Sequence, residues 1–331
     1  MDYDIKFMRR ALQLAARSPY DTHPNPMVGA VIINNGRVIG EGFHRRCGEG
    51  HAEVNAVASV ADKSLLADST IYVTLEPCSH YGKTPPCARL IIDSGLRRVV
   101  VGAVDPFEKV AGRGIAMLRA AGVEVVEGVL ADECRSLNRL FFTAHTRRRP
   151  FITLKWAESA DCFMDITRGE GEEAARFSTY LTQVDVHRLR ASHDAILTTA
   201  STVMADNPSL NCRLWDGPSP RRVVIDREGI LTKDFKVFAP ASKPTLLYRP
   251  AANGEDFGAA VETVDWNDKK SLGELMDDLY RRGVTSILVE AGPRFLQAML
   301  DAGLADAVRV ERAPFSLGAA GAHPSPRHKS R

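Results

Sequence analysis

The chain has 331 residues, which suggests about two domains, each long enough to bury its own core. Its 44% hydrophobic and 25% charged residues are ordinary for a globular protein, and no run of about 18 apolar residues predicts a membrane span. A net charge of +2 gives no reason to expect a nucleic-acid or anionic-membrane partner.

The first half of the chain alternates between helical and strand patterns. Apolar positions recur at roughly helical spacing over residues 4–17, and a buried strand at 28–33 leads to the hairpin turn Asn34-Asn35-Gly36. The later elements that we expect in this half are a strand at 38–44, a helix at 54–60, a strand at 71–75, a helix at 88–94, a strand at 98–104, a helix at 115–121, a strand at 122–126 and a helix at 133–143. Such alternation predicts an α/β layered sheet.

A pattern of metal-binding residues lies at the centre of this half. His51-Ala52-Glu53 comes just before a helix, Pro77-Cys78 follows a strand, and Pro86-Cys87 begins the next helix. One imidazole and two thiols can hold a zinc ion and leave the fourth tetrahedral position for water, whose pKa then falls towards ~7. This is the H-x-E and P-C pattern of zinc-dependent nucleobase deaminases. It predicts one zinc ion per chain on His51, Cys78 and Cys87, with Glu53 as the catalytic proton shuttle in the release of ammonia.

Two other interpretations of these residues compete with a catalytic metal site. Cys78 and Cys87 could be unrelated buried thiols, although the strand and helix around them favour zinc. A purely structural zinc ion would need a fourth protein ligand, and we do not expect Cys47 to bind, because three ligands complete a catalytic site. The thiols must stay reduced and the N-terminus lacks a signal-peptide pattern, so we expect a cytoplasmic location.

The spacing of the two cysteines differs from the usual deaminase pattern. Eight residues, Ser-His-Tyr-Gly-Lys-Thr-Pro-Pro, separate Cys78 from Cys87, where most nucleobase deaminases have P-C-x-x-C. This segment, with His23-Pro24-Asn25-Pro26 and Gly42-Phe43-His44, resembles the deaminase half of the bifunctional riboflavin-biosynthesis enzymes (RibD type). The resemblance implies a cytidine-deaminase-like domain over residues 1–146. The substrate contacts that it implies are Asn25, His44, His80, Lys83 and Thr84.

The second half resembles the other part of these enzymes, a dihydrofolate-reductase-like domain over residues 147–318 that binds NADPH. The basic run at 147–149 is expected to be a solvated linker. The elements expected after it are strands at 151–157, 194–199, 221–226, 244–248 and 285–290, a helix around 187–190 and an amphipathic helix at 271–282. The segment 201–213 is close to the family pattern T-x-x-x-D-[DN]-P-x-L-x-x-R. The strand, small-residue turn and helix around Gly292 are typical of an anion site.

The same resemblance implies the residues of a reductase site. The implied cofactor contacts are Ala157, Thr202, Asp206, Gly292, Pro293 and Arg294. The implied contacts to the ribose-phosphate substrate are Arg190, Leu210, Arg213 and Glu290. A phosphate held by two arginines is sound chemistry, because the guanidinium fork pairs with phosphate oxygens. Cys162 replaces a family glycine, and it carries strain if that glycine has a positive φ.

The end of the chain departs from the family. After Gly318 it is rich in small residues, proline and basic residues, with no strand pattern, and Pro324 and Pro326 lack the N–H groups of a sheet ladder. We therefore expect a disordered tail at 319–331 and a reductase domain truncated at its C-terminus. Deamination should then be intact and reduction weak or absent.

The sequence supports three functions to different degrees. The leading prediction is a bifunctional enzyme and homo-oligomer that deaminates 2,5-diamino-6-(5-phosphoribosylamino)pyrimidin-4(3H)-one and then reduces the ribosyl chain to ribityl with NADPH. Its alternative is a deaminase whose second domain is reductase-like but inactive. A nucleic-acid-editing deaminase would need a basic groove with stacking aromatic residues, and only 7% of the residues are aromatic. The expected partner is thus a small phosphorylated pyrimidine, with no nucleic acid and no membrane.

Overall fold

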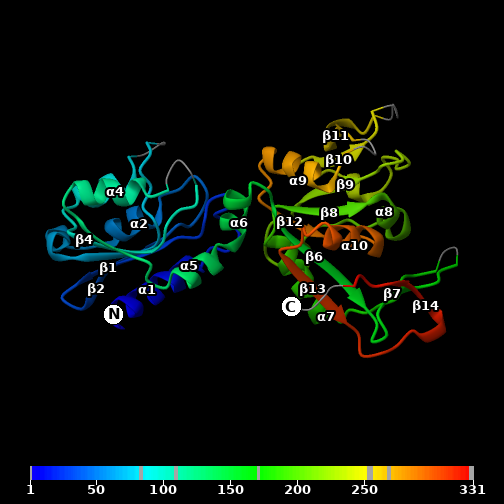
Figure 1. Cartoon of the computed structure of the whole chain (residues 1–331), viewed down its shortest axis with the longest axis horizontal. Helices are drawn as coiled ribbons and strands as arrows, with labels where there is room; N and C mark the ends of the chain where they lie inside the picture. The colour runs from blue at the N-terminus through cyan, green and yellow to red at the C-terminus, as the bar shows by residue number, and fades with distance from the viewer. Residues whose placement is uncertain are drawn as a thin grey trace. The chain divides into compact units, whose positions relative to one another are not determined.

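The computed structural model describes residues 2–81, 85–107, 111–169, 172–251, 256–266 and 270–327. The chain divides into two compact units, Met1–Arg147 and Arg148–Arg331 (Figure 1). Within the described residues, no helix is both long enough and apolar enough to cross a membrane.

The first unit is a five-stranded sheet with helices on both faces. The strand order is β2-β1-β3-β4-β5, in which β1 is antiparallel to both neighbours and β3, β4 and β5 run parallel (Figure 1). Its elements are α1 (Asp2–Ala15), β1 (Gly29–Asn34), β2 (Arg37–Phe43), α2 (Ala52–Ser59), the 3₁₀ helix η1 (Lys63–Asp68), β3 (Thr70–Leu75), α3 (Cys87–Asp93), β4 (Arg98–Ala103), α4 (Arg113–Ala120), β5 (Glu124–Glu127), α5 (Ala131–Leu137) and α6 (Arg139–Arg147).

Alternation along the central strand β1 explains the layers. Ala30 and Ile32 join the core formed with α2, α3 and α4, whereas Val31 and Ile33 join the core formed with α1 and α5. A strand buried on both faces is therefore apolar throughout, as the sequence predicts. The predicted hairpin turn is confirmed, because Asn35 and Gly36 both have the positive φ that a tight two-residue turn requires.

The single helix expected at 133–143 is wrong in its extent, because α5 and α6 are separate helices that meet at Asn138. The Asn138 side chain accepts a hydrogen bond from the Met27 N–H at 2.8 Å and donates one to the Met27 carbonyl oxygen at 2.8 Å. Asparagine competes for backbone groups in this way, and here it ends a helix while it holds a loop 111 residues earlier.

The second unit is a seven-stranded parallel sheet, also covered on both faces. The strand order is β11-β10-β9-β8-β12-β6-β13, and a separate antiparallel pair joins β7 to β14 (Figure 1). The elements are β6 (Phe151–Glu158), β7 (Phe163–Ile166), α7 (Tyr180–Ala191), β8 (Ala195–Thr199), α8 (Ala200–Asp206), β9 (Arg221–Ile225), η2 (Lys236–Phe238), β10 (Thr245–Arg249), η3 (Gly258–Ala260), β11 (Val261–Asp265), α9 (Leu272–Arg281), β12 (Ser286–Val289), α10 (Pro293–Asp301), β13 (Ala307–Arg312), η4 (Gly318–Ala320) and β14 (Gly321–Pro324).

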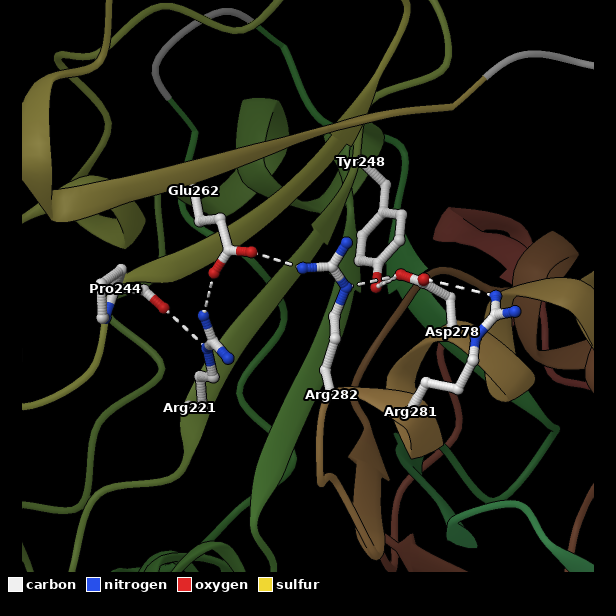
Figure 2. Close-up of polar contacts among 7 residues, drawn as sticks. All are labelled: Arg221, Pro244, Tyr248, Glu262, Asp278, Arg281 and Arg282. Atoms are coloured by element: carbon white, nitrogen blue, oxygen red, sulfur yellow. Dashed lines mark hydrogen bonds and ion pairs between the residues drawn. The ribbon is translucent and has the colours of Figure 1, made fainter.

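A chain of polar contacts ties the edge strand β11 and helix α9 to the sheet (Figure 2). Arg221, at the start of β9, donates to Glu262 on β11 at 2.6 Å, and Glu262 is also paired with Arg282. Arg282 reaches Asp278 of α9 at 2.6 Å, and Asp278 accepts the Tyr248 hydroxyl at 2.8 Å. The amphipathic helix expected at 271–282 is thus held by its polar side as well as by its buried side.

The basic run after α6 is more than a solvated linker. Arg149 forms two hydrogen bonds to Asp306, at 2.5 and 2.9 Å, and the two side chains are only 13% and 5% exposed. Asp306 also accepts the Ile152 N–H at 2.9 Å. The simple hinge prediction is wrong at Arg149, because a buried carboxylate far along the chain needs a cation.

The prediction of a tail without strands is also wrong. Residues 321–324 form β14, which pairs antiparallel with β7 so that Gly321 faces Ile166 and Pro324 faces Phe163. The Ser325 N–H then donates to the Cys162 carbonyl oxygen at 2.9 Å. A proline at the last residue of a two-stranded pair costs no central ladder bond, so its missing N–H does not prevent this strand.

Cys162 has φ +65°, which is the left-handed conformation anticipated for the replaced glycine. We expect Cys162→Gly to be more stable than Cys162→Ala by about 0.5–1 kcal/mol, because left-handed backbone is strained in residues with a Cβ, partly offset by the greater freedom of glycine in the unfolded chain. Urea unfolding of the two variants measures the difference, and equal midpoints would show that this turn is not strained.

Candidate active sites

The three predicted metal ligands lie together in the first unit. His51 immediately precedes α2, Cys78 follows β3, and Cys87 begins α3. The His51 Nδ1 atom is 3.7 Å from the Cys78 sulfur and 3.4 Å from the Cys87 sulfur, and all three ligand atoms lie within 4.8 Å of one another. Tetrahedral zinc with Zn–N and Zn–S bonds of ~2.0 and ~2.3 Å requires separations of about 3.5 Å. The cluster therefore fits a zinc ion.

The ionisation of the cysteines favours a bound cation, and the raised pKa of the neighbouring Glu53 suits it to carry protons. Hydrogen bonding with Cys87 lowers the pKa of Cys78 to about 4, and the same hydrogen bond, with burial, raises the pKa of Cys87. The pair thus holds a thiolate at neutral pH. Burial raises the pKa of Glu53 to about 7, and its side chain is almost fully enclosed. A carboxyl group with such a pKa can both accept and release a proton near neutral pH.

A buried carboxylate that the sequence did not point to lies two residues before Cys78. Glu76 is only 4% exposed, and its carboxylate accepts four backbone N–H groups. Asp105 and Gly112 donate to Oε2 at 3.2 and 2.9 Å, and Gly114 and Ile115 donate to Oε1 at 2.9 and 3.3 Å. Glu76 therefore holds the loop before α4 against the end of β3, two residues before Cys78. The sequence signal for this contact is the glycine pair at 112 and 114, because a Cβ at Gly114 would lie only 3.2 Å from the Glu76 carboxylate.

Two of the predicted substrate contacts of the deaminase lie beside this cluster. The Asn25 side-chain nitrogen is 3.2 Å from His44 Nε2, and the His44 and His51 rings meet edge to face at 5.5 Å. Burial lowers the pKa of His44, which keeps its ring neutral. His80, two residues after Cys78, is exposed. The remaining predicted contacts, Lys83 and Thr84, lie outside the described residues.

Cys47 stands apart from the metal cluster. It is exposed, and its backbone N–H donates to the Asp21 carbonyl oxygen at 2.9 Å. We expect elemental analysis to show that Cys87→Ser loses most of its zinc, whereas Cys47→Ser keeps about one equivalent per chain, because three protein ligands complete a catalytic site. Loss of zinc from Cys47→Ser would show that the ligand set is wrong.

The second unit contains a cavity of about 1150 Å³. It is lined by the end of β6, by α8 and the loop after it, by the turn into α10, and by residues 323–327 of the C-terminal segment. All predicted reductase contacts except Arg213 line it, namely Ala157, Arg190, Thr202, Asp206, Leu210, Glu290, Gly292, Pro293 and Arg294. Arg213 is exposed and is not among the lining residues, although it follows Leu210 on the same loop. The sequence did not predict that residues 323–327 line the cavity, because these residues have no strand pattern.

The charged groups of the cavity are largely paired. Arg190 donates to both carboxylate oxygens of Glu290, at 2.9 and 2.7 Å, and to the Asn211 carbonyl oxygen at 3.1 Å. Burial opposes ionisation of Glu290, but Arg190 outweighs it and lowers the pKa of the carboxyl. Asp206 accepts from Arg168 at 2.9 Å. The predicted phosphate ligand Arg190 therefore already uses three of its five N–H groups within the protein.

One side of the cavity fits the phosphates of a dinucleotide. Helix α10 starts at Pro293 after its N-cap Gly292, and both residues line the cavity, so the N-terminal end of the helix lies at its wall. A side chain at Gly292 would reach the hydroxyls of Ser201 and Thr202 at 3.9 and 4.0 Å, which shows how near the start of α8 lies. The Thr199 hydroxyl is 3.0 Å from that of Ser201. Hydroxyls and free N–H groups around one space suit phosphate oxygens.

Comparison with known proteins finds matches to both units of the chain. The family described as the cytidine and deoxycytidylate deaminase zinc-binding region matches residues 1–103, and the RibD C-terminal domain family matches residues 150–329. The riboflavin biosynthesis protein RibD of Bacillus amyloliquefaciens is 38% identical over 322 residues, which cover 94% of this chain and 85% of the relative. The RibD protein of Escherichia coli is 38% identical over 332 residues, covering 95% of this chain and 89% of the relative.

A solved structure agrees along the whole chain. Acinetobacter baumannii RibD (form 1) superposes with a TM-score of 0.89 at 33% identity and covers 100% of this chain and 92% of its own. Together with the family match through residue 329, this agreement does not support the predicted truncation of the reductase domain, and the expectation of weak reduction loses its basis. The chain therefore belongs to the RibD family and is a bifunctional pyrimidine deaminase and reductase of riboflavin biosynthesis, with a cytidine-deaminase-type zinc region followed by a RibD C-terminal domain.

Proposed function

We propose that the first unit deaminates 2,5-diamino-6-(5-phosphoribosylamino)pyrimidin-4(3H)-one and that the second unit reduces the product with NADPH, converting its ribosyl chain to ribityl. The observation that carries the deaminase half is the cluster of His51, Cys78 and Cys87 next to the buried Glu53. The sequence motifs around it support the choice of pyrimidine. We extend the proposal to a homo-oligomer in the cytoplasm, where the two thiols stay reduced.

In the deaminase site the residues of the chain divide the work. His51, Cys78 and Cys87 would hold the zinc ion, which would supply acidified water as the nucleophile. Glu53 would take up a proton from the attacking water and deliver it to the amino group, which leaves as ammonia while the ring carbon becomes a carbonyl. His44 and Asn25, beside His51, orient the pyrimidine.

In the reductase site the cavity holds two phosphorylated molecules. NADPH would supply the hydride for C1′ of the ribosyl group, whose ring bond to O4′ opens as O4′ gains a proton. The N-terminus of α10, the hydroxyls of Thr199, Ser201 and Thr202, and Arg294 bind the dinucleotide phosphates. Arg190 and Arg213 approach the ribose phosphate, with Glu290 holding Arg190 in place.

The test is product analysis with the diaminopyrimidine phosphate, with and without NADPH. Ammonia should be released in both cases, and the ribityl product should form only with NADPH, in step with its oxidation. Ammonia release without any NADPH oxidation would favour the alternative, a deaminase whose second domain is inactive. Light scattering of the same preparation measures the oligomeric state.

The proposal has support from a solved relative. The protein from Thermotoga maritima, 37% identical with a TM-score of 0.85, covers 97% of this chain and 90% of its own, and is described as a diaminohydroxyphosphoribosylaminopyrimidine deaminase and 5-amino-6-(5-phosphoribosylamino)uracil reductase. Those are the substrate and the second reaction proposed for this chain.

A further inference from the structure

A buried histidine contacts the loop that carries Arg213. His187 lies on α7 and is only 3% exposed. Its Nδ1 atom accepts the backbone N–H of Arg213 at 3.0 Å. Arg213 belongs to the loop after α8, whose Pro208 and Leu210 line the reductase cavity. One imidazole thus joins helix α7 to the rim of the cavity.

The protonation state of His187 suits this role. Burial, with the neighbouring charges of Arg190 and Arg213, lowers the pKa of His187 to about 4. The ring is neutral at physiological pH, so Nδ1 has a free lone pair and Nε2 carries the proton. A charged ring could not accept the Arg213 N–H.

The loop needs an anchor, because its backbone is not relaxed. Asn207 and Leu210 both have positive φ, at 40° and 50°, a conformation that residues with side chains rarely adopt. Besides the His187 contact, the Cys212 thiol donates to the His187 carbonyl oxygen at 3.3 Å, and Arg190 donates to the Asn211 carbonyl oxygen. Helix α7 therefore holds three consecutive loop residues.

Within the described residues, Arg213 on this loop differs from Arg190 and Arg168 because no carboxylate is paired with it. Arg190 is paired with Glu290, and Arg168 is paired with Asp165 and Asp206. The Arg213 side chain, in contrast, contacts the neutral Asn211 amide oxygen at 3.3 Å, and no carboxylate within the described residues is recorded as its partner. Its charge is available to a phosphate at the cavity rim.

We propose that His187 is a positioning residue of the reductase site, which fixes the backbone of Arg213 so that its guanidinium meets the phosphate of the ribosyl substrate. This inference rests on the proposed reductase function and adds a residue to it. The plainer interpretation is that His187 only fills buried space. The two interpretations predict different phosphate affinities when His187 is replaced by a side chain of similar size that cannot accept a hydrogen bond.

The test compares His187→Leu, which fills similar space without an acceptor, with His187→Asn, whose side-chain oxygen can take the place of Nδ1. Ribose 5-phosphate is the binding probe, titrated calorimetrically into the full chain. The leucine variant should bind it about tenfold more weakly or worse, the loss expected when one charge-assisted hydrogen bond is misplaced. The KM of the ribosylaminouracil substrate should rise in parallel, while the KM of NADPH and ammonia release stay unchanged. The asparagine variant should bind within about threefold of wild type.

His193→Leu is the matched control. His193 is also buried, two residues after the end of α7, and its ring contacts Thr153 at 2.8 Å and the Leu189 carbonyl oxygen at 2.8 Å. It should lower the melting temperature without changing ribose 5-phosphate affinity.

Four outcomes would refute the role of His187: wild-type affinity in His187→Leu, an asparagine variant as weak as the leucine variant, an equal rise in the KM of NADPH, or wild-type protein that does not bind ribose 5-phosphate. Wild-type protein that binds the probe yet oxidises no NADPH with the substrate would refute the proposed reductase function instead.

Discussion

Replacing Glu53 by glutamine should remove nearly all ammonia release, by roughly 10²–10⁴-fold, while the protein keeps its zinc. Glutamine has almost the same shape as glutamate, so the buried position beside His51 stays filled. It can neither take a proton from water nor deliver one to the departing amine. Ammonia release under saturating substrate measures the loss, and elemental analysis of the same sample measures the zinc.

The second unit provides the control for this variant. NADPH oxidation with 5-amino-6-(5-phosphoribosylamino)uracil should be the same in Glu53→Gln and wild type, because Glu53 belongs to the separate first unit. Near-normal ammonia release by the zinc-loaded variant would show that another group moves the proton. Loss of both activities would indicate a folding defect instead.

Gly114→Ala should disable the metal site, although residue 114 is not a ligand. A Cβ atom at this position would lie 1.9 Å from the Pro77 carbonyl oxygen and 3.2 Å from the Glu76 carboxylate. Either Pro77 or the start of α4 must move, and Cys78 follows Pro77 directly. Displacing the groups that orient a metal ligand typically costs about 10–100-fold in metal affinity or activity. Competition with a chromophoric zinc chelator measures the affinity, and ammonia release should fall with it.

Gly112→Ala, in the same turn, separates this clash from a general effect of alanine. A Cβ at Gly112 meets no atom of the described residues within 4 Å, although its φ of +72° imposes left-handed strain. That strain should lower the free energy of unfolding by about 1–2 kcal/mol and leave zinc affinity nearly unchanged. Equal zinc affinities in the two variants would show that the contact between Gly114 and Pro77 does not position Cys78.

The sequence by itself determined the metal cluster and the layered fold of the first unit, because both depend on short-range patterns. His51, Cys78 and Cys87 stand at the ends of elements whose apolar periodicity and prolines mark where they begin and stop. Once the strand before Cys78 and the helix after Cys87 are placed, the three metal ligands must lie close together. The buried strand β1 and its turn at Asn35 could likewise be predicted from residues that are close together in the sequence.

Only the tertiary structure decided how distant polar groups are paired. Glu76 receives N–H groups from residues 29 to 39 positions further on, and Arg190 meets Glu290 across 100 residues. Periodicity shows which face of an element is buried, but not which backbone group or charge lies opposite it. The C-terminal segment is the clearest case. Its prolines correctly indicate lost hydrogen-bond donors, yet they carry no information about β7, whose free edge lies where β14 can pair with it. A strand with weak intrinsic preference forms when tertiary contacts supply its partner, and those contacts are not written in its own residues.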